Sequence, residues 1–195
     1  MQSASLATKK SLRDGALARR DALDPAWRVE ASLGMAAAAA MIEVSPGMVV
    51  SGFWPMRSEV DPRPLMAALA EKGARLCLPA ILDRTTLVFR EHVSDAPLVG
   101  MGFGTQGPGE GAIVLDPAVM LVPLAAFDGR GERIGYGAGY YDRAIARLHE
   151  KGMKPRLIGV AFDSQRVEAV PAEAHDASLD EILSESGLRQ FPLVP

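Results

Sequence analysis

From residue 48 onward the sequence alternates short apolar runs with helix-like segments, and no other feature constrains the fold as strongly. Helical patterns cover 64–71 and 139–150, and each follows a short apolar run. Strands joined through helices form a mostly parallel sheet with helices on both faces. We therefore expect an α/β fold, a single three-layer domain of Rossmann-like architecture over residues 1–195. The predicted strands cover 48–54, 75–78, 86–92, 119–123 and 157–162.

The amino-terminal part of the chain predicts two helices. Apolar residues at helical spacing indicate the first helix before residue 23. Asp24 supplies an N-cap and Pro25 fits a first helical turn, so a second helix is expected to run through residues 36–40. The pair Pro46-Gly47 ends it. We expect these two helices to cover the sheet together with the helices that come later in the chain.

Charge and cysteine content exclude several protein classes. With 21 basic and 24 acidic residues the formal charge is −3, which excludes a generally basic nucleic-acid coat. The lone Cys77 cannot form an internal disulfide, and no cluster has zinc-ligand spacing. The chain shows neither a signal peptide nor an apolar run of membrane-spanning length. We expect a cytoplasmic protein with small-molecule partners, no nucleic-acid or membrane partner, and an oligomeric state that the sequence leaves open.

Two glycine-rich stretches lie at 99–111 and 128–139. Neither matches the dinucleotide-binding fingerprint, because Tyr140 stands where the second stretch would need its third glycine, and neither has a Walker A ending. The second stretch follows a strand and leads into a helix. Glycine backbone N–H groups and a helix N-terminus can together hold a phosphate. From the residues alone, a tightly turned surface loop is an equally good interpretation.

The string RIGYGAGYYDR at 133–143 resembles the glycine-tyrosine-aspartate signature of the 5-formyltetrahydrofolate cyclo-ligase family. Other blocks resemble the same family in the same order along nearly the whole chain. They are KKSLRDGALARRDAL, SGFWPMRSEVDPRPLMAAL, LVPLAAFDGRGERIGYG and VPAEAHDASLDEIL. The resemblance implies conversion of 5-formyltetrahydrofolate to 5,10-methenyltetrahydrofolate, with ATP as co-substrate, Mg²⁺ as metal, and ADP and phosphate as products.

The resemblance also implies a role for individual residues. It gives catalytic roles to Arg13, Glu59 and Tyr140, and metal-binding roles to Asp142 and Asp176. The implied ATP contacts are Lys9, Arg13, Arg133, Ile134, Gly135, Tyr136, Gly137, Ala138, Gly139, Tyr140 and Tyr141. The implied folate contacts are Trp54, Glu59, Tyr136, Gly137, Gly139 and Tyr140.

Each of these assignments has a simpler structural alternative. Lys9 and Arg13 are four residues apart and share a helix face, but a solvated amphipathic helix has the same pattern. Asp142 in a first helical turn is favoured by the helix dipole alone. Trp54 and Tyr140 can be core aromatics. At the level of function, the alternative to the enzyme is a non-catalytic folate- or nucleotide-binding α/β module.

Overall fold

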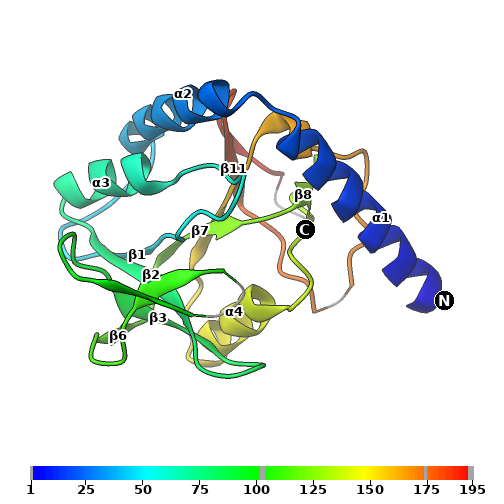
Figure 1. Cartoon of the computed structure of the whole chain (residues 1–195). Helices are drawn as coiled ribbons and strands as arrows, with labels where there is room; N and C mark the ends of the chain where they lie inside the picture. The colour runs from blue at the N-terminus through cyan, green and yellow to red at the C-terminus, as the bar shows by residue number, and fades with distance from the viewer. Residues whose placement is uncertain (1, 102–103, 174, 193–195) are drawn as a thin grey trace.

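The computed structural model describes residues 2–101, 104–173 and 175–192 of the chain (Figure 1). Its described part contains one sheet of eight strands and two small hairpins. The sheet consists of β1 (Val49–Ser51), β2 (Arg75–Ile81), β3 (Leu87–Glu91), β6 (Val114–Leu115), β7 (Val119–Pro123), β10 (Arg156–Val160), β11 (Glu181–Ser184) and β12 (Gly187–Gln190). The hairpins pair β4 (Leu98–Gly100) with β5 (Gln106–Pro108), and β8 (Ala126–Phe127) with β9 (Arg133–Ile134).

The strand order β12-β11-β10-β7-β1-β2-β3-β6 contains one reversal of direction. From β1 the chain adds β2 on one side, and later adds β7 on the other side of β1. The five central strands, β11 to β2, are parallel, whereas β3, β6 and β12 pair antiparallel toward the edges. In open α/β sheets, ligands bind outside the carboxyl ends of the strands at such a reversal. The topology therefore points to the loops that follow β1 and β7.

Helices cover both faces of this sheet, as Figure 1 shows. Successive residues of the central strands point to opposite faces. Leu121 and Ile158 pack with α2, α3 and a 3₁₀ helix, η1, whereas Met120 and Leu157 pack with α4. The three-layer, mostly parallel α/β fold expected from the sequence is confirmed. The helices are α1 (Gln2–Asp21), α2 (Pro25–Met35), η1 (Ala36–Ala40), α3 (Arg63–Glu71), α4 (Tyr140–Glu150) and the 3₁₀ helix η2 (Asp163–Gln165).

Helix α1 lies along the outside of the molecule, against the β8–β9 hairpin and η2 (Figure 1). Ala16 is fully buried there, in a small cluster with Ala126, Ile134 and Val170. A residue with a single methyl group lets the helix approach the hairpin closely. This contact fixes which face of α1 is turned toward the rest of the protein.

Several element boundaries differ from those predicted. Strand β2 runs to Ile81 instead of residue 78, and β10 covers Arg156–Val160 instead of 157–162. The second helix begins as expected, with Asp24 accepting a hydrogen bond from the Trp27 N–H at 2.9 Å, but its α-helical part ends at Met35 and the alanines that follow form η1. The first strand ends at Ser51 instead of Trp54, since Gly52 leads the chain out of the sheet. A Cβ at Gly52 would lie 2.3 Å from the Met66 sulfur of α3, so any larger residue there would force the Met66 side chain to move.

Within the described residues, every helix is either too short or too polar to span a membrane.

Candidate active site

The loops that follow β1 and β7 carry most of the predicted site residues. We call residues 52–62 the Glu59 loop and residues 129–139 the glycine-rich loop. The Glu59 loop leaves β1 directly, whereas the glycine-rich loop is connected to the neighbouring parallel strand β7 through β8 and includes β9. Side chains of α1 contact both loops. Segments that lie far apart in the sequence are thus brought together at one place in the fold.

The glycine-rich loop ends at the start of α4, where the N-cap residue makes no side-chain hydrogen bond in the described structure. Gly137 and Gly139 have φ values of +103° and +64°, which residues with a Cβ rarely adopt. Gly139 is the N-cap of α4 and, as a glycine, has no side chain with which to cap the first turn. The first N–H groups of an α-helix have no partner inside the helix, and they favour an anion. The predicted glycine-rich turn into a helix is present, and phosphate binding by it stays a prediction.

Arginines hold this loop from two sides. The Arg13 Nε–H of α1 donates to the Gly135 carbonyl at 2.8 Å, and the Arg13 guanidinium lies over Gly137. On the other side, Arg143 donates to the carbonyl of Ala138 at 2.8 Å and to that of Thr85 at 2.8 Å. Both guanidinium groups place positive charge next to the backbone of the loop.

Arg133 is a buried cation at the beginning of the predicted signature. Its Nη2 donates to Asp142 Oδ1 at 2.7 Å, and its side chain is only 4% exposed. The other terminal nitrogen, Nη1, is buried without a hydrogen-bond partner. A buried donor that lacks a partner carries a free-energy cost that a bound acceptor removes.

Lys9 forms an ion pair with acidic residues near the end of the chain. Its Nζ lies 2.7 Å from Asp176 Oδ2 and 3.4 Å from Glu173 Oε1. Burial alone would lower the pKa of Lys9, but the hydrogen bond and charge of Asp176, together with Glu173, raise it above its ordinary value. Burial alone would raise the pKa of Asp176, and the bond to Lys9 lowers it below its ordinary value. Both groups are therefore charged at neutral pH.

The two aspartates predicted as metal ligands lie close to each other. Asp142 Oδ1 accepts the N–H of Ala177, the residue after Asp176, at 3.2 Å. Each carboxylate uses one oxygen for a cationic side chain, Asp142 for Arg133 and Asp176 for Lys9. No group of three or more histidine, cysteine, aspartate or glutamate side chains gathers within the described ranges. The protein itself thus offers at most a two-carboxylate site here.

Glu59 is partly buried, and one of its carboxylate oxygens has no hydrogen-bond partner among the described residues. Its Oε2 accepts the Met56 N–H at 2.8 Å, whereas Oε1 is buried without a hydrogen-bond partner. Burial raises the pKa of Glu59, and the nearby Tyr136 hydroxyl and Arg20 guanidinium oppose that rise. An acceptor left free inside the protein is suited to a ligand that brings its own N–H group.

Sequence reasoning did not single out Arg20, which is 3% exposed. Its Nε–H donates to Ser58 Oγ at 2.9 Å and its Nη1–H donates to the Tyr136 hydroxyl at 2.6 Å. The available signal was spacing, because Arg20 follows Arg13 by seven residues and therefore shares its face of α1. Arg20 connects the Glu59 loop to the glycine-rich loop.

The other aromatic residues predicted for the site contact groups that lie outside the glycine-rich loop. The Tyr140 hydroxyl donates to the Asp83 carbonyl at 3.1 Å, away from Glu59's own hydrogen bonds, and Arg143 stacks on its ring at 5.3 Å. The Trp54 ring carries the Arg63 guanidinium at 4.9 Å and meets the His92 ring edge-on. Tyr141 packs edge-on against Phe89, its hydroxyl buried and without a hydrogen-bond partner.

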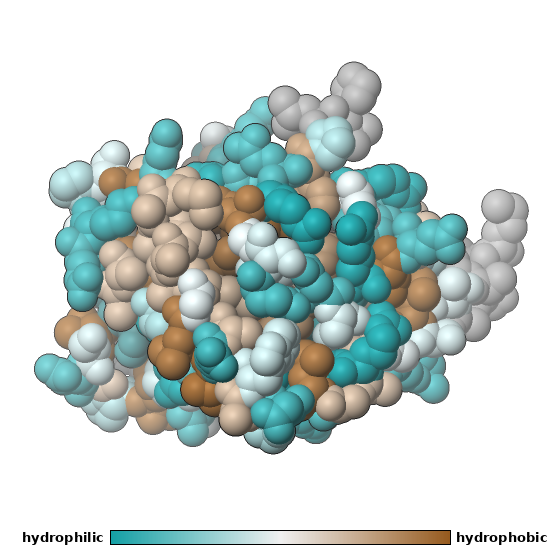
Figure 2. All heavy atoms as spheres, turned by 90° about the horizontal axis from the view of Figure 1, so that it is seen from above, coloured by the Kyte–Doolittle hydropathy of each residue, from teal (hydrophilic) through white to brown (hydrophobic). Residues whose placement is uncertain are grey.

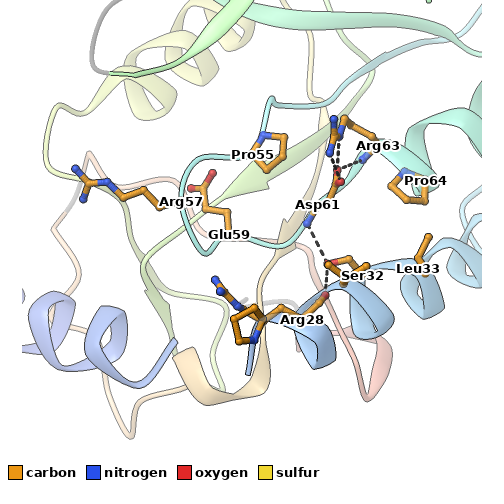
Figure 3. A pocket seen from close by; sticks show the side chains of 11 residues that line it. Arg28, Ser32, Leu33, Pro55, Arg57, Glu59, Asp61, Arg63 and Pro64 are labelled. Atoms are coloured by element: carbon orange, nitrogen blue, oxygen red, sulfur yellow. Dashed lines mark hydrogen bonds and ion pairs between the residues drawn. The ribbon is translucent and has the colours of Figure 1, made fainter. Parts of the chain in front are cut away.

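A cavity of about 390 Å³ opens beside Glu59. Figure 3 shows the Glu59 loop on one side and Arg28, Ser32 and Leu33 of α2 on the other, with Asp61 bonded to both Ser32 and Arg63. Over α2 and η1 the surface carries brown, apolar patches among polar ones (Figure 2). Of the predicted site residues, Glu59 alone lines this cavity; the glycine-rich loop contributes nothing to its wall.

Comparisons with known proteins agree on one family. The model of the 5-formyltetrahydrofolate cyclo-ligase family matches residues 5–185. The 5-formyltetrahydrofolate cyclo-ligase of Escherichia coli is 30% identical over 177 residues, which are 86% of this chain and 95% of that protein. The Mycolicibacterium smegmatis cyclo-ligase is 28% identical over 193 residues, covering 91% of this chain and 93% of that protein.

Solved structures give the same answer for the fold. The 5,10-methenyltetrahydrofolate synthetase of Aquifex aeolicus superposes with a TM-score of 0.77 at 28% identity, over 96% of this chain and 94% of that one. The synthetase of Mycoplasma pneumoniae, at 22% identity, shares the fold with a TM-score of 0.70 over 89% and 96% of the two chains. The chain belongs to the 5-formyltetrahydrofolate cyclo-ligase family.

Proposed function

We propose that the family's reaction takes place where α1, the glycine-rich loop and the Glu59 loop meet, with ATP on the glycine-rich loop and the folate beside Glu59. Enzymes of this family convert 5-formyltetrahydrofolate to 5,10-methenyltetrahydrofolate and use ATP. One observation carries the proposal. The two loops are connected to the neighbouring strands β1 and β7 at the reversal of the sheet. Each contains a buried polar atom that has no hydrogen-bond partner among the described residues, Glu59 Oε1 and Arg133 Nη1.

On the nucleotide side, the protein supplies cations and backbone donors. Arg13 and Lys9 come from one face of α1, and the uncapped start of α4 presents its N–H groups after Gly139. The unpaired Nη1 of Arg133 adds a donor. Phosphoryl transfer depends mainly on positioning and on neutralising charge, so this set of groups suits a triphosphate.

On the folate side, the formyl oxygen is a poor leaving group and must be activated before it can leave. The first folate nitrogen carries the formyl group. The oxygen of this group attacks the γ-phosphorus of ATP, and the bond from that phosphorus to ADP breaks. The second folate nitrogen then attacks the formyl carbon and loses its proton, and the carbon–oxygen bond breaks to release phosphate. No protein nucleophile is needed, and Glu59 orients the folate by accepting a hydrogen bond on Oε1.

Asp142 and Asp176 fit the binding of Mg²⁺ together with a nucleotide. Mg²⁺ is usually held by one or two carboxylates plus substrate phosphates, with water completing its coordination. In the described residues, Asp142 Oδ2 makes no hydrogen bond, and Asp176 Oδ1 lies 3.7 Å from His175 Nε2. Bound there, Mg²⁺ would neutralise phosphate charge during the transfer.

A spectroscopic assay tests this arrangement. The methenyl product absorbs in the near ultraviolet, so protein, ATP, Mg²⁺ and 5-formyltetrahydrofolate should together produce a new band. We expect Arg13→Ala to raise KM for ATP about tenfold or more with a smaller effect on the folate, and Glu59→Gln to do the reverse.

Lys10→Ala is the matched control for Arg13→Ala, because Lys10 is an exposed cation of the same helix whose ion pair is with Asp14. Its KM values should not change. Equal effects of Arg13→Ala and Glu59→Gln on the two substrates would show that the sides of the site are assigned wrongly. A folded protein that binds ATP but gives no band would be a binding module instead.

A further inference from the structure

Arg20 is a buried charge for which the proposed function gives no role. Arg20 is only 3% exposed, although it belongs to α1, a helix on the outside of the molecule (Figure 1). Arginine is almost never buried unless its charge is paired. Its backbone position on α1 places it on the face that carries Arg13 and Ala16. A guanidinium in this position needs acceptors, and those it finds come from both substrate-binding loops.

The hydrogen bonds of Arg20 join three segments. Nε–H donates to Ser58 Oγ at 2.9 Å, and Nη1–H donates to the Tyr136 hydroxyl at 2.6 Å. The Ser58 hydroxyl donates in turn to the Asp21 carboxylate, which follows Arg20 on α1. Ser58 directly precedes Glu59, and Tyr136 lies between Gly135 and Gly137 of the glycine-rich loop. One side chain therefore bonds both to the residue before Glu59 and to Tyr136, itself a predicted binding residue.

The shape of the guanidinium makes this connection rigid. Its N–H groups form a planar fork with fixed angles, and bonds from a charged donor are stronger than neutral ones. Two acceptors on one fork cannot move independently. The Arg20 cation also lies over the Tyr136 ring, 5.9 Å from its centre, which adds a second restraint on the same tyrosine.

We propose that Arg20 is a positioning residue that holds the Tyr136 hydroxyl and the Ser58–Glu59 turn at a fixed separation, so that the ATP on one loop faces the folate on the other. This inference rests on the proposed function. Reactions that depend on alignment lose rate when two bound reactants shift by about 1 Å, even where both still bind. Loss of Arg20 should therefore act mainly on kcat.

The test compares Arg20→Gln with Arg19→Gln. The control removes the same charge one residue earlier, where Arg19 is exposed and donates to the Ser164 and Arg166 carbonyls. We expect Arg20→Gln to lower kcat about 10- to 100-fold while both KM values stay within about threefold. Arg19→Gln should keep the wild-type kcat. Equal kcat losses in both variants, or a loss confined to KM, would overturn the proposal.

A double-mutant cycle separates positioning from simple support of the fold. If Arg20 acts through Tyr136, then Arg20→Gln combined with Tyr136→Phe should cost little more in kcat than the larger single change. Losses that multiply would show that the two residues act independently and would contradict the inference. Should Arg20→Gln not fold, Ser58→Ala with Tyr136→Phe removes the two acceptors of the fork instead, and the same non-additivity is expected.

The cycle also distinguishes this inference from the proposed function. Coupling between positions 20 and 136, without the opposite KM effects of Arg13→Ala and Glu59→Gln, would leave the connection intact and reject the placement of the substrates. The opposite KM effects without coupling would keep the placement and reject the role of Arg20.

Discussion

In the part of the chain that the structure describes, three buried polar atoms without a hydrogen-bond partner belong to side chains of the predicted site. They are Glu59 Oε1, Arg133 Nη1 and the Tyr141 hydroxyl. Native proteins pair nearly all buried polar atoms, since an unpaired one costs about 1–3 kcal/mol. Residues that retain such a cost near one another are expected where a ligand supplies the missing partners. This unpaired state leads to the first prediction, which concerns Glu59.

We predict that Glu59→Gln stabilises the protein at neutral pH. Burial raises the pKa of Glu59, so the folded state binds a proton more readily than the unfolded state. Stability of the wild type is therefore lost as the pH rises from the ordinary glutamate pKa through the raised value, whereas the amide has no such loss. Thermal unfolding from pH 4 to pH 8 should show a Tm advantage that grows to about 2–4 °C.

Glu71→Gln is the control for this titration, because Glu71 is exposed at the end of α3. Its Tm should follow that of the wild type at every pH. A Tm difference for Glu59→Gln that does not change with pH would contradict the burial argument.

Asp142→Asn should raise the Mg²⁺ concentration needed for half-maximal turnover about tenfold, because the amide removes one anionic oxygen from the two-aspartate pair. It should also lower Tm, since Arg133 would lose its charged partner. The measurement is a Mg²⁺ titration of the absorbance assay, with Asp116→Asn as control at the surface pair with Lys151. A lower Tm with an unchanged titration would leave Asp142 with a structural role only.

Among the elements, the glycine-rich loop was the most fully predicted. Its glycines, the helix that follows and the Lys9–Arg13 spacing are all visible in the sequence. The Asp24 cap was also predictable because its partner is three residues away. The end of the first strand was not, since the pairing of β1 with β2 and β7, far away in the sequence, sets where it stops. Local periodicity carries no information about such pairing.

Gly137→Ala should impair nucleotide use through the backbone. The φ of +103° at Gly137 is strained for alanine, and the added Cβ would lie 3.4 Å from an Arg13 guanidinium nitrogen. We expect a Tm loss of about 2–4 °C and a rise in KM for ATP of about tenfold. Gly152→Ala, with φ of +77° and open space around it after α4, should lose similar stability with an unchanged KM. Equal KM values in both variants would contradict the role of the loop.

At the scale of the whole molecule, packing in the core leads to a prediction about the reactivity of Cys77. Cys77 lies in β2 with its side chain in the cluster on the α4 side of the sheet, where it is 0% exposed, and burial raises the pKa of its thiol. Because the thiolate is the reactive form, a thiol reagent at pH 8 should modify the native protein at least about a thousandfold more slowly than the protein in concentrated guanidinium chloride. Rapid modification of the native protein would show that this layer opens readily.

Taken alone, the sequence determined the α/β class, the glycine-rich loop and the family, because alternating periods, glycines at set spacing and ordered motifs are properties of neighbouring residues. That the chain forms a single domain over 1–195, and which residues act in the site, stay predictions. Only the tertiary structure decided which strands are neighbours, and hence that the Glu59 loop and the glycine-rich loop meet. It alone revealed Arg20, whose partners lie 38 and 116 residues away, since packing across the sheet, and not local pattern, brings such distant groups within hydrogen-bonding distance.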